Sequence, residues 1–104
     1  MSKFIFAYHG GKQPETQEEM TKIMNEWKNW LGSLGNTLVD PGHPVGPSKT
    51  VNGKVVDDNG GANPLSGYTL ITAENMDSAL EIAKGCPHRS HGTIEVAELI
   101  ELNF

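Results

Sequence analysis

The feature of this sequence that most constrains its fold is the stretch of residues 66–102, which predicts a strand, a helix and a second strand in close succession. Residues 67–73 (GYTLITA) are rich in β-branched and aromatic residues and are apolar on both alternating faces, as in a strand that is covered on both sides. Residues 76–83 carry apolar side chains at helical spacing, and residues 93–102 return to the alternation of a strand. This order predicts a helix packed against a sheet.

The ends of this helix are also marked in the sequence. Asn75 or Glu74 can cap its N-terminus with a side-chain oxygen. Gly85 ends the helix, and Pro87 prevents it from resuming. A short polar corner then leads into the last strand.

The last strand leaves two alternatives open. Its apolar face is formed by Ile94, Val96, Ile100 and Leu102, and Glu98 falls in the same phase. Either a β-bulge near Ala97 turns Glu98 outward, or the carboxylate points inward among apolar groups. Because an unpaired inward carboxylate is costly, we favour the bulge.

The N-terminal region supplies a further strand and a longer helix. Residues 2–9 alternate Phe and Tyr with Ile, Ala and His, so both faces of the predicted strand are usable for packing. A capping box from Thr16 to Glu19 starts a helix whose apolar stripe reaches Leu34. Two tryptophans lie on that stripe, and we interpret them as part of the core.

Two shorter elements lie in the middle of the chain. Residues 37–39 predict a short strand that runs into Asp40. Residues 49–57 predict a β-hairpin that turns at Asn52-Gly53, the strongest two-residue turn signal. Its brief strands with polar edges are typical of an edge element.

The predicted order of elements is strand, helix, strand, hairpin, strand, helix, strand. It corresponds to an α+β fold of the ferredoxin-like βαββαβ type, with an antiparallel sheet and two helices on one face. In that topology residues 2–9 and 67–73 form the two central strands. The second face has no cover within the chain, so we expect a homodimer joined through the open sheet face.

Size and charge limit the partners. The chain has 104 residues, the size of one domain, and 13 acidic against 8 basic residues for a formal net charge of −5. Because the basic residues are scattered, we expect no nucleic-acid partner. A single cysteine suits a reducing compartment, and no apolar run is long enough to span a membrane. We therefore expect a cytoplasmic protein with no membrane partner.

The segments GYTLITAENMDSALEIAKGCPH and GTIEVAEL resemble the C-terminal half of the YCII-related family, which belongs to the dimeric α/β-barrel group. The resemblance implies one YCII-like domain over residues 1–104 and a dimeric α/β barrel. In some members a His–Asp pair in the cleft is proposed to be catalytic, and residues 39–42 (VDPG) resemble the strand end that carries its aspartate, here Asp40. The histidine that some members place on the first helix has no counterpart here, and the Asp-Gly-Pro-Phe signature of a related branch is also absent.

His88 is the first candidate for a catalytic residue, because imidazole exchanges protons near neutral pH. It lies in the corner after the second predicted helix, at one end of the sheet, beside the pocket that we expect the dimer to enclose. The alternative is a histidine that only stabilises the helix C-terminus. Asp40 would orient His88 or share its proton; alternatively, it forms a turn by hydrogen-bonding its own backbone. The predicted substrate-binding residues are Tyr8, His43, Tyr68 and His91.

A metal site is the weaker interpretation of the same corner. Cys86, His88 and His91 lie close together in the sequence, but their C-x-H-x-x-H spacing matches none of the common zinc patterns. We therefore predict no metal site and no cofactor. Cys86 follows a helix C-terminus, where the dipole opposes a thiolate, so we expect a raised pKa and a buried, unreactive thiol.

Two functions follow from these residues. The first is a cofactor-independent lyase, isomerase or hydrolase that acts on a small molecule through a His/Asp acid–base pocket containing His88 and Asp40. The second is a non-catalytic module that binds a small molecule or serves only in dimerisation. Fold analogy does not separate them, because this architecture hosts both.

Overall fold

A four-stranded antiparallel sheet forms the centre of the molecule in the computed structural model, which describes residues 1–102. Its strands are β1 (Ser2–Gly10), β2 (Leu38–Asp40), β5 (Leu65–Ala73) and β6 (Gly92–Glu98), and their order is β2-β5-β1-β6. Each neighbouring pair is antiparallel. The predicted ferredoxin-like α+β fold is confirmed, with β1 and β5 as the two central strands.

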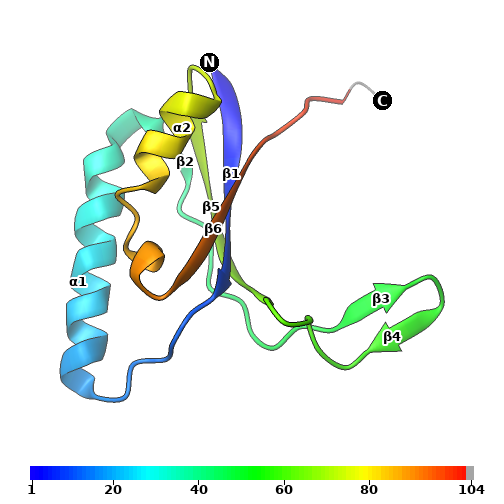
Figure 1. Ribbon diagram of the computed structural model, residues 1–104. Coiled ribbons are helices and arrows are strands. Elements are labelled where there is room, and N and C mark those ends of the chain that lie inside the picture. The colour runs from blue at the N-terminus through cyan, green and yellow to red at the C-terminus, as the bar shows by residue number, and fades with distance from the viewer. Residues whose placement is uncertain (103–104) are drawn as a thin grey trace.

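Both helices cover the same side of this sheet. Figure 1 shows α1 (Gln17–Leu34) and α2 (Met76–Ala83) together on one side, whereas the hairpin of β3 (Thr50–Asn52) and β4 (Val55–Asp57) projects on the other. None of the helices within residues 1–102 is both long and apolar enough to cross a membrane.

α1 begins at the predicted capping box. The Thr16 hydroxyl accepts a hydrogen bond of 3.1 Å from the Glu19 backbone N–H. The Glu19 carboxylate accepts one of 2.9 Å from the N–H of Glu15, one residue before the cap, so two otherwise unpaired donors are satisfied. At the far end, Gly35 adopts a φ of 54° and leads into a short 3₁₀ turn, η1 (Gly35–Thr37).

Of the two predicted caps for α2, the structure has Asn75. Its side chain accepts a hydrogen bond of 2.9 Å from the Ser78 N–H. Beyond α2 the predicted polar corner contains a short 3₁₀ helix, η2 (Pro87–Ser90), with Pro87 at its first position. A proline is tolerated there because its missing N–H would have no partner in any case.

The core lies between the sheet and the two helices. Phe4, Phe6 and Tyr8 of β1 are buried on the helix side, and Phe6 stacks on Trp30 with ring centroids 6.3 Å apart. The interpretation of the tryptophans as core is confirmed for Trp30, which is 8% exposed, whereas Trp27 is half-buried. The opposite side, which we call the open face, presents the half-buried side chains of Ile5, Ala7, Tyr68 and Leu70.

The last strand differs from its prediction. β6 ends at Glu98, and its register with β1 runs without a shift from the Gly10–Gly92 pair to the Phe4–Glu98 pair. The favoured bulge near Ala97 is therefore wrong, and so is the inward carboxylate, because Glu98 is exposed. Beyond Glu98 the Leu99 N–H still donates a hydrogen bond of 2.8 Å to the Lys3 carbonyl, but the strand does not continue. Residues 99–102, which were predicted to continue this strand, are exposed and lie outside any strand.

The turn of the hairpin is displaced by one residue from its prediction. Asn52 pairs with Val55, so the two loop residues are Gly53 and Lys54 rather than Asn52 and Gly53. Gly53 has a φ of 63° and no residue other than glycine within residues 1–102 has a positive φ. A glycine in the first loop position is typical of a type II′ turn, which needs a positive φ only there.

Candidate active site

A cavity of about 390 Å³ lies between α1 and one end of the sheet. α1 lines it with Ile23, Met24, Trp27 and Leu31, and the sheet contributes Tyr8, whose ring meets Trp27 edge-on at 5.3 Å. The loops of residues 10–14 and 41–44, together with η2, complete the wall. All of these residues come from one chain.

His88 lies on the wall of this cavity in one defined tautomer. Its Nε2 is 3.0 Å from the backbone oxygen of His9. A carbonyl oxygen can only accept a hydrogen bond, so Nε2 carries the proton and donates it. The other ring nitrogen, Nδ1, then holds a lone pair, and it has no hydrogen-bond partner within residues 1–102. A neutral His88 is therefore a proton acceptor at Nδ1.

Two glycines leave room for this imidazole. A Cβ atom built on Gly92 would lie 2.6 Å from His88 Nε2 and closer still to the His9 carbonyl oxygen. A Cβ on Gly11 would lie 3.1 Å from His88 Cε1. Any side chain at Gly92 would therefore displace the ring or break its hydrogen bond. In the sequence Gly11 was visible only as a strand-ending residue.

Tyr8 belongs to a hydrogen-bond chain with a fixed direction. Its hydroxyl donates to Thr69 Oγ1 at 2.7 Å, and Thr69 Oγ1 donates to the Pro41 carbonyl oxygen at 3.1 Å. Because the Pro41 oxygen only accepts, both protons must point toward it. Burial raises the pKa of the Tyr8 phenol, and the hydrogen bond to Thr69 offsets this only in part. Tyr8 is thus a neutral wall residue whose proton is held by Thr69.

The other predicted substrate-binding residues lie nearer the rim. His43, Tyr68 and His91 are all among the lining residues, and His43 and His91 are exposed. The Tyr68 ring meets His43 at a centroid distance of 6.4 Å. Tyr68 alternates with Thr69 along β5, so its side chain is on the open face and does not converge with Tyr8.

Asp40 is not among the residues that line the cavity. Its carboxylate accepts a hydrogen bond of 2.8 Å from the Gly42 N–H, which is the local turn that we weighed as its alternative role. Gly42 has a φ of 75° and packs directly on the Tyr68 carbonyl, where a side chain has no space. Asp40 therefore shapes the 41–44 wall, and a proton shared between Asp40 and His88 stays a prediction.

Three lining residues were not singled out as functional from the sequence. Lys12 was one of several scattered basic residues, Thr69 was one β-branched residue of a strand, and Trp27 was assigned to the core. Their roles depend on contacts with distant parts of the chain. Only Trp27, half of an aromatic pair on a helical stripe, offered a signal that could have indicated a ligand wall.

Cys86 is buried in the core, and it is not part of a cluster of metal-binding side chains within residues 1–102. Cys86 is fully buried, and burial raises the pKa of its thiol more than the hydrogen bond with the His88 backbone lowers it. The expected raised pKa is thus confirmed, although burial rather than the helix dipole is its main cause. Among residues 1–102, no three His, Cys, Asp or Glu side chains lie close enough to hold a metal ion together.

With this geometry in view, comparison with known proteins establishes the family. A sequence model of the YCII-related domain matches residues 1–103. The chain belongs to the YCII-related family. No curated protein sequence matches this YCII-related chain.

The YCII-related chain also has a structural relative. It is similar to 5-chloro-2-hydroxyhydroquinone dehydrochlorinase (TftG) from Burkholderia phenoliruptrix AC1100, solved in complex with 2,5-dihydroxybenzoquinone. The TM-score is 0.57, with 14% sequence identity over 93% of each chain. At this identity the similarity supports the shared fold.

Proposed function

We propose that this YCII-related protein is a cofactor-independent enzyme that moves protons on a small molecule, in the manner of a lyase, isomerase or hydrolase. One observation carries the proposal. The His88 ring lines a mostly apolar cavity and is held by its Nε2–H bond to the His9 carbonyl, which leaves Nδ1 with a free lone pair. A base oriented by a second group is the usual arrangement of acid–base catalysis.

The proposed chemistry is a single proton transfer and its return. In a lyase or isomerase, His88 Nδ1 takes a proton from the bound substrate, and the negative charge stays on the substrate. In a hydrolase it takes the proton from a water molecule that attacks the substrate. The resulting imidazolium keeps its Nε2–H bond to the His9 carbonyl, whose dipole stabilises the positive charge. The proton then returns to another atom of the substrate or to a leaving group. Tyr8 and Trp27 position the substrate, and Asp40 acts through the turn that shapes the 41–44 wall.

The structural relative supports a starting choice of substrates. TftG is a dehydrochlorinase seen with 2,5-dihydroxybenzoquinone, a small hydroxylated ring. The cavity, at about 390 Å³, is of a size that accommodates a ligand of this kind. We therefore expect substrates among small hydroxylated ring compounds.

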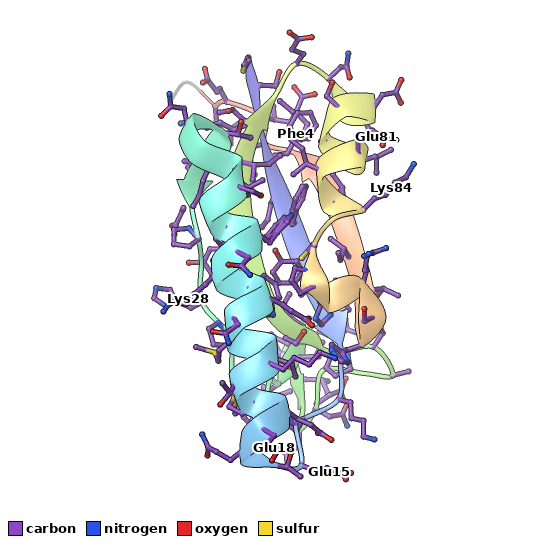
Figure 2. The ribbon with its side chains drawn as sticks, turned by 90° about the vertical axis from the view of Figure 1, so that its left-hand side faces the viewer. Phe4, Glu15, Glu18, Lys28, Glu81 and Lys84 are labelled. Atoms are coloured by element: carbon purple, nitrogen blue, oxygen red, sulfur yellow. The ribbon has the colours of Figure 1, made fainter. Side chains whose placement is uncertain are left out.

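The test is turnover of a panel of such compounds, followed by ultraviolet absorbance. His88→Gln is expected to lower the rate by at least about 100-fold, the contribution typical of a positioned acid–base group. Lys28→Gln is the control, because Figure 2 shows Lys28 pointing from α1 into solvent. The proposal is overturned if His88→Gln converts a substrate as fast as the wild type.

One observation favours the alternative, a non-catalytic module that binds a small molecule. The carboxylate of Asp40 accepts a hydrogen bond from the Gly42 N–H in its own turn, and no hydrogen bond joins it to His88 within residues 1–102. Under this alternative, ligands from the panel would raise the melting temperature in proportion to their concentration, while none would be converted.

We further propose that the chain forms a homodimer through the open face. The half-buried Ile5, Ala7, Tyr68 and Leu70 would be covered by the same residues of a second copy. The β3–β4 hairpin projects on that same side in Figure 1 and exposes three valines, Val51, Val55 and Val56, by 60–70%. The partly exposed side chains of the open face and the exposed valines of the hairpin support an interface there.

A further inference from the structure

We infer that the cavity binds a planar anion and that Lys12 is the residue that recognises its negative charge. This inference rests on the proposed function, because it names the substrate class of the same cavity. Its basis is the charge of the lining, the position of Lys12 and the shape of the apolar wall.

The lining differs in charge from the rest of the protein. It includes Lys12 and the histidines His43, His88 and His91, and within residues 1–102 it includes no Asp or Glu. The chain as a whole has 13 acidic and 8 basic residues. An anion that is repelled by most of the surface therefore meets a site free of carboxylates, with one fixed positive charge.

Lys12 is free to serve a ligand at the mouth of the cavity. It lies in the loop between β1 and α1, and its side chain is 76% exposed. The nearest carboxylate is that of Glu15, whose Oε1 is 3.8 Å from Lys12 Nζ. This separation is beyond hydrogen-bonding distance, and an exposed pair of this kind is weak. The ammonium donors of Lys12 are thus available to an anionic ligand.

The inner wall favours a flat and largely apolar body. The rings of Tyr8 and Trp27 stand edge to face, and Ile23 and Leu31 extend the same surface. Flat rings gain contact area against such a wall at little cost in conformational entropy. His88 Nδ1 accepts the proton of an acidic group, and the anion that this transfer leaves is the species that Lys12 stabilises.

Benzoate and benzamide test the inference, because they have nearly the same size and shape and differ in charge. Quenching of tryptophan fluorescence reports binding, since Trp27 lines the cavity. We expect benzoate to bind about fivefold more tightly than benzamide, the effect of one solvated charge pair at about 4 Å. Lys12→Met should abolish this preference and leave benzamide binding unchanged, whereas Lys12→Arg should retain it.

Two matched variants separate a local effect from net charge. Lys28→Met removes the same charge from the outer side of α1 and should leave both affinities unchanged (Figure 2). Glu15→Gln removes the competing carboxylate and should strengthen benzoate binding by about twofold.

The inference is overturned if the wild type binds benzoate and benzamide equally, or if Lys28→Met weakens benzoate as much as Lys12→Met does. These are binding measurements, so they are independent of turnover. Loss of turnover in His88→Gln without any preference for benzoate would reject the anion inference and retain the proposed enzyme. A preference for benzoate without turnover of any substrate would retain the anion inference and reject the proposed enzyme.

Discussion

The tautomer of His88 is set by groups that carry no side-chain chemistry of their own. A backbone carbonyl, that of His9, receives the Nε2 proton, and the absence of a side chain at Gly92 allows the two to approach within 3.0 Å. Thr69 has a similar effect on Tyr8, since its hydroxyl accepts a hydrogen bond from the phenol and donates one to the Pro41 carbonyl. At the residue scale, backbone carbonyl acceptors therefore fix which atoms of His88, Tyr8 and Thr69 carry the protons.

Replacing Gly92 by alanine should disrupt this arrangement. The added Cβ would lie 2.6 Å from His88 Nε2, so we expect a loss of about 1–3 kcal/mol in the free energy of unfolding, as for other overpacked sites. Urea denaturation measures this change. Gly32→Ala is the control, because nothing lies within 4 Å of its Cβ and alanine should stabilise α1 by about 0.5–1 kcal/mol. An unchanged stability of Gly92→Ala would contradict the geometry of the His88 pocket.

At the scale of elements, the site depends on α2 and on the turn that follows it. α2 has only eight residues, too few to be stable alone, and it directs the chain into η2, which carries His88. Its stability comes from the burial of Ala79 and Ala83 and from the cap at Asn75. Destabilising either end of α2 would therefore also disturb the position of His88.

Removing the cap tests this dependence. Asn75→Ala leaves the Ser78 N–H without its acceptor, and we expect a loss of about 1 kcal/mol in the free energy of unfolding. Thr21→Ala removes a hydroxyl that bonds only to the Gln17 carbonyl within α1, so it should change stability by less than about 0.5 kcal/mol. Both values come from chemical denaturation. Equal losses in the two variants would show that the cap has no special role.

The whole molecule is more extended than its length requires. Its radius of gyration is 15.1 Å, whereas a compact domain of about 100 residues has a value near 13 Å. The projecting hairpin accounts for the shape in Figure 1 and leaves the open face uncovered by this chain. A second copy placed against that face would restore a compact outline.

Light scattering of the purified protein should accordingly give twice the mass of the chain. Leu70→Glu places a charge on the open face and should convert the dimer into a monomer. Leu80→Glu is the matched control, because Leu80 is 41% exposed on α2, in the helix layer, and should leave the dimer intact. A wild-type monomer at working concentrations would reject the dimer.

Prediction from the sequence succeeded where a signal lies within a few residues. Thr16 was recognised as a cap, and Asn75 was one of two candidates for the other cap, because each bonds to a residue three positions away. Glu98 and the hairpin turn were assigned wrongly because each depends on the register of a partner strand. His88 was named as a candidate from its chemistry alone, while its tautomer depends on His9, which is 79 positions away.

The sequence by itself determined the order of the elements and the two central strands, and it named His88 as a candidate catalytic residue. Periodicity, capping and side-chain chemistry act over short distances along the chain. The tertiary structure alone decided which groups share the cavity, that Asp40 faces its own turn, and that Lys12 stands at the mouth. Those outcomes depend on where strand register and helix packing place residues that are far apart in sequence, and no local pattern records that information.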